Sequence, residues 1–355
     1  MREHKSIFSS SSGLGLRAGD WVEVRSTEEI LATLDERARL DALPFMPEML
    51  EYCGKQFRVY KSAHKTCDTI EHYNIPRRMT NAVHLEGLRC DGAAHGGCQA
   101  GCLIFWKEAW LKRVPDPRPE ATPATVPARS ARACDDSTDA QCDTATLYQE
   151  TRAQVPDAAA DGSPRYSCQA TELLKATTPM QWWWPGPYLK DLTTGNVRLS
   201  TMIRYGFLAA YNMAMRKIAQ LNWRGQVFVW PYIQGLGGEK TPTVELNLQP
   251  GELVRVRSKY DIMCTLNRAQ KNRGLYFSVA MVQYCGNTYR VLRRVEKILD
   301  EKSGKMLHFS GSCVILDGVI CTSLLTRYRL FCPRSVYSFW HEIWLERVGQ
   351  AKTQE

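Results

Sequence analysis

The sequence lacks any long hydrophobic run. No apolar stretch among its 355 residues approaches the roughly 20 residues that a helix needs to cross a bilayer. The N-terminal residues 1–16 are rich in serine and lack the apolar core of about 7–15 residues that marks a secretory signal peptide. These absences argue against a membrane-spanning protein. They predict a cytoplasmic protein with a flexible N-terminus over residues 1–16.

Familiar catalytic motifs are also missing. The chain has no G-x-S-x-G, no P-loop and no H-E-x-x-H, since the nearest runs read HLEG and HFSG. No block of Lys and Arg dominates either, and the net charge of +9 is spread along the chain. Such a spread favours a solvated surface over a nucleic-acid site. We therefore expect a small-molecule substrate or a partner protein, with nucleic acid less favoured and no membrane partner.

Cysteine, in contrast, is abundant, with 13 residues in the chain. Disulfides are uncommon in the reducing cytoplasm, so clustered cysteines there more often bind a metal or carry out redox chemistry. Scattered cysteines such as Cys264 are better explained as small buried apolar side chains. The position of each cysteine therefore decides how it is interpreted.

The sequence repeats itself with an offset of 232 residues, because residues 19–61 align without a gap on residues 251–293. With small gaps the match continues, and HLEGLRC, ending at Cys90, pairs with ILDGVIC, ending at Cys321. The run FWKEAWLKRV (105–114) pairs with FWHEIWLERV (339–348). An internal duplication of about 100 residues therefore organises the chain.

Each copy is predicted to contain several short strands and one or two short helices. The run GDWVEVRS alternates like a half-buried strand. Ser26 and Glu29 have the spacing of a capping box for the helix that follows. The G-[DE]-x-V-x-V opening of both copies resembles the first strand of small SH3-like barrels. The predicted class is α+β, with two homologous, mainly β, SH3-like barrel domains joined by a disordered linker and a central helical segment.

The predicted domain boundaries follow the changes in composition. The first repeat spans residues 17–114, and the second spans residues 246–350. Residues 115–165 are rich in Pro, Ala, Asp and Thr. They are predicted to form a flexible linker because they cannot bury enough apolar surface to offset chain entropy. Residues 166–245 carry helical spacing and are predicted to form a central helical region.

The stretch CDGAAHGGCQAGC, residues 90–102, is the strongest candidate site. It holds Cys90, Cys98 and Cys102 among glycines that let backbone N–H groups turn toward sulfur. Cys67 would complete a four-thiolate set in the first copy, and His95 is a weaker candidate ligand. The spacing C-x7-C-x3-C matches neither zinc ribbons nor ferredoxins. Zinc and an iron–sulfur cluster therefore both stay open as the cofactor, and a His95 ligand would favour zinc.

The second copy keeps three cysteines in register with the first, which argues that the ancestral unit used some of them. Cys285 is the weakest of these, because Tyr-Cys-Gly before an apolar strand suits a buried side chain. The fourth ligand of the second copy is expected to be Cys168, at the start of the central region, with Cys285 as the alternative. The full set of predicted metal ligands is Cys67, Cys90, Cys98, Cys102, Cys168, Cys313, Cys321 and Cys332, with His95 and Cys285 as weaker candidates.

The motifs GDWVEVRS, PFMPEM, KTCDTI, HLEGLRCDG, HGGCQAGC and FWKEAWL resemble a bacterial family of tandem-repeat, cysteine-rich proteins. The resemblance covers both repeats and the QATELL segment. It implies a bacterial cytoplasmic protein associated with biosynthetic enzymes. The family has no established activity, so the resemblance assigns no catalytic residue.

Two hypotheses of function follow from these patterns. The first is a metal-thiolate protein, with iron–sulfur or zinc and one Cys site per repeat, serving a redox or biosynthetic reaction as a metalloenzyme or redox component. The second is a non-catalytic adaptor that binds a protein or nucleic-acid partner and whose barrels are stabilised by structural zinc. The sequence leans to the first hypothesis, although it identifies no catalytic residue.

Overall fold

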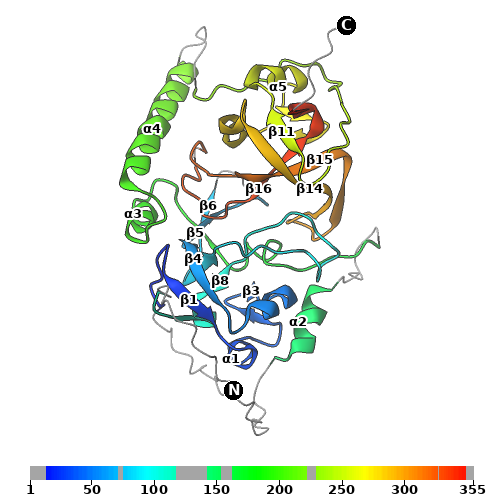
Figure 1. The fold of residues 1–355 in the computed structure, drawn as a ribbon. Coiled ribbons are helices and arrows are strands. Elements are labelled where there is room, and N and C mark those ends of the chain that lie inside the picture. Colours follow the sequence, from blue (N-terminus) through cyan, green and yellow to red (C-terminus); the bar gives the residue numbers. More distant parts are fainter. Residues whose placement is uncertain are drawn as a thin grey trace, which may run out of the picture.

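The fold is mixed α and β, as the sequence predicts. The computed structural model describes residues 13–70, 75–116, 142–152, 162–221, 229–326 and 328–348. Two five-stranded antiparallel sheets dominate, one in the lower half and one in the upper half of Figure 1. Among the described residues, no helix combines the length and the apolar character that crossing a bilayer requires.

The two sheets have the same topology. The first has the order β8-β7-β4-β1-β9, and the second has the order β16-β15-β14-β11-β17. The first contains β1 (Trp21–Val24), β4 (Gln56–Ser62), β7 (Ala82–Leu85), β8 (Trp106–Lys107) and β9 (Leu111–Arg113). The second contains β11 (Leu253–Val256), β14 (Thr288–Leu299), β15 (Met306–Ile320), β16 (Tyr337–His341) and β17 (Leu345–Arg347). The orders correspond strand by strand, so the duplication of sequence is also a duplication of topology.

Neither sheet closes into a barrel in the described part of the chain. The last strand of each sheet returns to the first, pairing Val22 with Arg113 and Val254 with Arg347. The far edge strands, β8 and β16, end the sheets without reaching the strands at the opposite edge. The α+β class is therefore confirmed, whereas the closed SH3-like barrel is not.

The shorter elements connect these strands. They are β2 (Arg39–Leu40), β3 (Leu43–Pro44), β5 (Lys65–Cys67), β6 (Pro76–Arg78), β10 (Thr178–Pro179), β12 (Lys271–Asn272), β13 (Leu275–Tyr276), and the 3-10 helices η1 (Pro47–Tyr52), η2 (Glu108–Trp110), η3 (Val279–Tyr284) and η4 (Glu342–Trp344). The helix α1 (Thr27–Leu31) begins at the predicted capping box, in which the Glu29 amide donates to Ser26 Oγ over 3.2 Å. Ser258 caps α5 (Lys259–Thr265) at the matching place.

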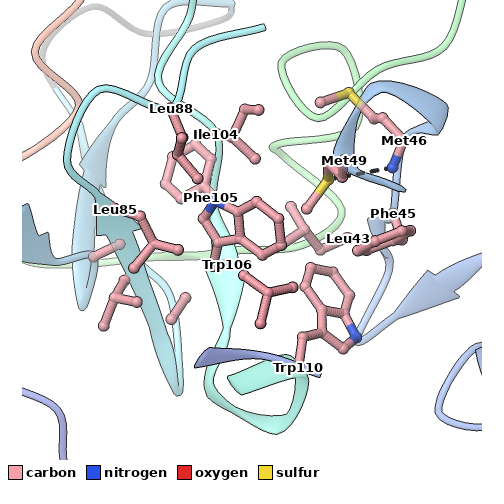
Figure 2. Packing of buried hydrophobic residues seen from close by; sticks show 14 of the residues in the cluster. Leu43, Phe45, Met46, Met49, Leu85, Leu88, Ile104, Phe105, Trp106 and Trp110 are labelled. Atoms are coloured by element: carbon pink, nitrogen blue, oxygen red, sulfur yellow. Dashed lines mark hydrogen bonds between the residues drawn. The ribbon is translucent and has the colours of Figure 1, made fainter. Parts of the chain in front are cut away.

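Each sheet packs on an equivalent aromatic core. In the first repeat, Phe45 meets the edges of Trp106 and Trp110 with ring centroids 6.2 and 5.2 Å apart, and Figure 2 shows these rings among buried Leu and Met side chains. The second repeat repeats this arrangement with Phe277, Trp340 and Trp344. Aromatic rings bury large areas and prefer such edge-to-face contacts. The aromatic residues shared by the two copies are therefore core residues.

The described part of the region between the repeats contains the helices α2, α3 and α4. The helix α2 (Thr144–Thr151) lies inside the predicted linker and buries Leu147 in the first core. The helices α3 (Gly186–Thr193) and α4 (Leu199–Leu221) belong to the predicted central region, and α4 runs along one flank of the molecule in Figure 1. Residues 1–12, 117–141 and 153–161, which make up most of the predicted flexible N-terminus and linker, lie outside the described residues.

The candidate cysteine loop lies where the two repeats meet. The Gln99 side-chain oxygen accepts hydrogen bonds from the backbone amides of Glu296 (2.6 Å) and Lys297 (3.1 Å) on β14. The sulfur of Cys98 accepts another from the Leu299 amide (3.3 Å), and the Leu299 side chain packs into the first core. The second repeat therefore fixes the loop that carries the cysteines of the first.

Candidate metal centre

Glycines shape the loop that carries the candidate ligands. Gly92, Gly96, Gly97 and Gly101 all have positive φ values, which side chains disfavour. At Gly92 a Cβ atom would lie 2.0 Å from the carbonyl oxygen of Cys98, so only glycine fits there. The turn brings the Cys90 amide within 2.9 Å of the Cys102 carbonyl. The density of glycine in this stretch thus folds its cysteines toward one another.

Cys90, His95 and Glu48 meet at this turn. The Cys90 sulfur lies 3.1 Å from His95 Nε2 and 3.2 Å from Glu48 Oε1. One ligand-type atom from each of the three side chains lies within 4.8 Å of the other two. Glu48 comes from η1, where Pro47 occupies the first turn. Two elements that are distant in sequence therefore converge on this point.

Two buried polar atoms of this cluster have no hydrogen bond within the described part of the chain. The His95 side chain is 1% exposed and the Glu48 side chain is 6% exposed. His95 Nδ1 and Glu48 Oε2 are both buried and unsatisfied. A buried polar atom left in this state costs about 1–3 kcal/mol. A bound cation would offset part of this cost by engaging the carboxylate and fixing the imidazole.

Further thiols line a small cavity together with two members of this cluster, Cys90 and His95. The cavity has a volume of about 40 Å³, and its lining includes Cys90, His95, Cys98, Cys102 and Cys168. A space of this size admits an ion or a water molecule. It is far smaller than the roughly 300–1,000 Å³ of a typical small-molecule site. The geometry therefore suits an ion enclosed by protein side chains.

Burial keeps three of these thiols, those of Cys90, Cys102 and Cys168, protonated when no cation is bound. Desolvation and the nearby Glu48 carboxylate raise the pKa of Cys90 well above its usual value. Burial also raises the pKa of Cys102 to about 11 and that of Cys168 to about 12. Burial lowers the pKa of His95, which keeps its imidazole neutral. Neutral imidazole already has the form that binds metals, and a metal ion displaces the thiol protons.

The structure groups the predicted ligands differently from the sequence. Cys90, Cys98, Cys102 and His95 line one cavity, and so does Cys168, which was expected to serve the second copy. Cys67 lies on β5 and does not line the cavity. Instead, its side chain contacts Cys332 of the second repeat.

The predicted ligands of the second copy do not converge on one point. Cys313 is buried on β15 opposite His341, and the Cys321 sulfur lies 3.4 Å from the Ser323 hydroxyl. Cys285 is half-buried just after η3. Among the described residues, the one group of three potential ligand atoms within such short distances is that of Glu48, Cys90 and His95.

Glu48 is the functional candidate that sequence reasoning missed. It lies in the duplicated segment, where the gap-free alignment pairs it with Ala280 of the second repeat. The sequence did contain a signal for Glu48, because the first copy has a carboxylate within an apolar run where the second copy has none. The alanine at this position also gives a physical reason why the described residues of the second copy contain no equivalent cluster.

Comparison of the chain with protein-family models, curated proteins and solved structures found no match. Fold alone does not define function, so the function is inferred from the site. The resemblance to a bacterial tandem-repeat family therefore stays a prediction.

Proposed function

We propose that this chain is a zinc-binding protein with one buried structural site, in its first repeat. Cys90, His95 and Glu48 hold the ion, and a thiol of the same cavity supplies a fourth ligand. The observation that carries this proposal is the convergence of three ligand-type atoms within 4.8 Å, with unsatisfied buried polar atoms on two of the three side chains.

The chemistry of the ligands favours zinc over an iron–sulfur cluster. Zinc accepts sulfur, imidazole nitrogen and carboxylate oxygen in tetrahedral sites. Iron–sulfur clusters are held mainly by sets of cysteine thiolates. A site centred on Cys90, His95 and Glu48 contains all three donor types and therefore matches zinc better.

The size of the cavity supports a structural role. Catalysis at zinc needs an open coordination position that a substrate can reach, and a space of about 40 Å³ offers no room for an organic molecule. This supports the non-catalytic adaptor hypothesis over a redox or biosynthetic reaction, with a protein as the partner.

We include a cytoplasmic location in this proposal, because every cysteine among the described residues is a free thiol. We also propose that the two sheets are open SH3-like units, which their shared strand order supports.

A thiol nucleophile is a competing explanation for the same three residues. His95 Nε2 faces the Cys90 sulfur, and His95 Nδ1 lies 3.7 Å from Glu48, an order that resembles a catalytic triad. However, Glu48 also lies 3.2 Å from the sulfur itself, where its charge opposes a thiolate. The raised pKa of Cys90 keeps its thiol protonated at neutral pH. The arrangement therefore suits a cation better than a nucleophile.

The test compares two glutamates of the same 3-10 helix. Glu48→Gln removes a charged ligand, so we expect zinc affinity to fall at least tenfold, as measured by competition with a chromophoric chelator. Glu51→Gln removes an exposed carboxylate from η1, and we expect its affinity to equal that of the wild type. Equal affinity in Glu48→Gln and wild type would reject the proposed ligand set.

A further inference from the structure

A second pair of thiols lies apart from the zinc cluster, between the two repeats. In Figure 1, β5 and β6 lie where the two halves of the molecule meet. Lys65 Nζ on β5 donates a hydrogen bond to the Leu330 carbonyl (2.9 Å). Four residues further along both segments, Arg334 donates to the Thr69 hydroxyl (2.8 Å). These two side-chain hydrogen bonds bring residues 65–69 and 330–334 together.

Cys67 and Cys332 occupy the middle of this paired segment. Each lies two residues inside both of these hydrogen bonds. Their side chains are hydrogen-bonded to one another, and the residues are only 6% and 3% exposed. They are therefore preorganised as a pair across the boundary between the repeats.

The charges around the pair make the two sulfurs unequal. The hydrogen bond from Cys332 and the positive charges of Arg334 and Arg329 lower the pKa of Cys67, although burial opposes them. The same hydrogen bond and burial raise the pKa of Cys332. These surroundings therefore favour the thiolate form at Cys67 and the protonated thiol at Cys332. A thiolate next to a neutral thiol is the arrangement in which one sulfur attacks an oxidant and the other resolves the product.

We propose that Cys67 and Cys332 are a peroxide-sensitive dithiol that closes into a disulfide between the two repeats. The two sulfurs are separate from the proposed zinc ligands, since neither lines the cavity that Cys90 and His95 line, although Arg334 lies between the two sites.

The reaction balances with hydrogen peroxide as the oxidant. The Cys67 thiolate attacks one peroxide oxygen, which breaks the O–O bond and gives a sulfenic acid and hydroxide. The Cys332 sulfur then attacks the Cys67 sulfur, and the sulfenic oxygen leaves as water with the Cys332 proton. In total, the two thiols lose two electrons and the peroxide gains two. A thiol such as glutathione reduces the disulfide again by thiol–disulfide exchange.

Closing this bond would join positions 265 residues apart in the sequence. A cross-link of that span restricts the unfolded chain strongly. It would also fix the contact between the two repeats covalently. Oxidation is therefore expected to raise the midpoint of denaturant unfolding for the whole chain.

Peptide mapping of the full-length, zinc-loaded protein tests this proposal. After treatment with hydrogen peroxide, free thiols are blocked with N-ethylmaleimide and the protein is digested with trypsin without reduction. Cys67 is the only cysteine of peptide 66–77, and Cys332 is the only cysteine of peptide 330–334. We expect these two peptides to appear as one disulfide-linked species that a reductant separates.

Two variants and a control show the order of the reaction. In Cys332→Ser the sulfenic acid on Cys67 has no resolving thiol, so a dimedone adduct should accumulate on peptide 66–77. In Cys67→Ser we expect neither the linked species nor an adduct on Cys332, whereas Cys285→Ser should behave as the wild type. Finding both wild-type peptides blocked separately after peroxide, or linked to other cysteines, would overturn the proposal. The wild-type map decides this even if a variant does not fold.

Discussion

At the scale of single residues, one difference between the repeats sets a sensitivity to acid. His84 on β7 is fully buried, its ring lies 4.4 Å from that of Phe105, and its Nδ1 contacts the Ile104 carbonyl. Burial lowers the pKa of His84 to about 3 from an ordinary value of 6.5. The aligned residue of the second repeat is Ile315. The first repeat therefore contains a titratable group where the second has an aliphatic side chain.

This difference predicts a pH dependence of stability. The pKa of His84 is lower in the folded protein than in the unfolded chain, so the unfolded chain takes up a proton first as the pH falls. The contribution of His84 to stability is therefore complete above pH 6.5. It is lost as the pH falls toward 3, by up to about 1.4 kcal/mol per pH unit. We expect His84→Ile to flatten the loss of unfolding free energy between pH 7 and about pH 4.5. Urea unfolding of metal-free wild type and variant measures the two slopes, and parallel slopes would contradict this account.

Residues that act locally were predictable, and those that act across the fold were not. Cys90 and His95 lie five positions apart in one glycine-rich loop, so sequence alone placed them together. Glu48 reaches the same point only because η1 packs beside that loop. Cys168 could not be assigned to the correct repeat, since nothing in its own segment shows which core it joins. Cys67 was grouped by proximity in sequence, whereas the structure pairs it with a residue of the other repeat.

At the scale of elements, the geometry of the cysteine loop depends on glycine. Gly92 and Gly87 have similar φ values of 77° and 75°. A Cβ at Gly87 would meet open space, whereas one at Gly92 would collide with the backbone of Cys98. A side chain at either position would therefore meet the same backbone strain, and only a side chain at Gly92 would also collide with the backbone of Cys98.

This pair predicts a specific effect on zinc. Gly87→Ala is expected to cost about 1–2 kcal/mol, the penalty for placing a side chain in the left-handed region. Gly92→Ala should cost more and should also weaken zinc binding, because the Cys98 backbone must move. Thermal unfolding and zinc titration of both variants provide the measurement. Zinc affinities that fall equally, or not at all, would argue against a metal site formed by this turn.

The elements themselves were partly predictable. The strands β1 and β11 and the cap of α1 follow from local alternation and side-chain chemistry, so the sequence located them. Barrel closure depends on whether distant edge strands meet, and no local pattern encodes that contact. The helix α2 was missed because the segment around it is poor in large apolar residues, and it depends on burying Leu147 against the first repeat.

At the scale of the whole molecule, the cysteine loop couples the repeats. Gln99 and Cys98 accept three hydrogen bonds from backbone amides of β14. Zinc that stabilises the loop should therefore stabilise both repeats. We expect zinc removal by a chelator to lower the midpoint of a single thermal transition, followed by calorimetry. A shift confined to one of two separate transitions would show that the loop does not couple the repeats.

The most direct measurement of the central claim is the zinc content of the purified protein. We expect one zinc ion per chain in the wild type and in Cys264→Ser, which changes an exposed thiol, and a loss of most bound zinc in Cys90→Ser. Cobalt substituted into the wild type should show an absorption band from thiolate coordination, and this band should weaken in Cys90→Ser. A wild-type protein without stoichiometric metal, or a Cys90→Ser variant that retains it, would contradict the account.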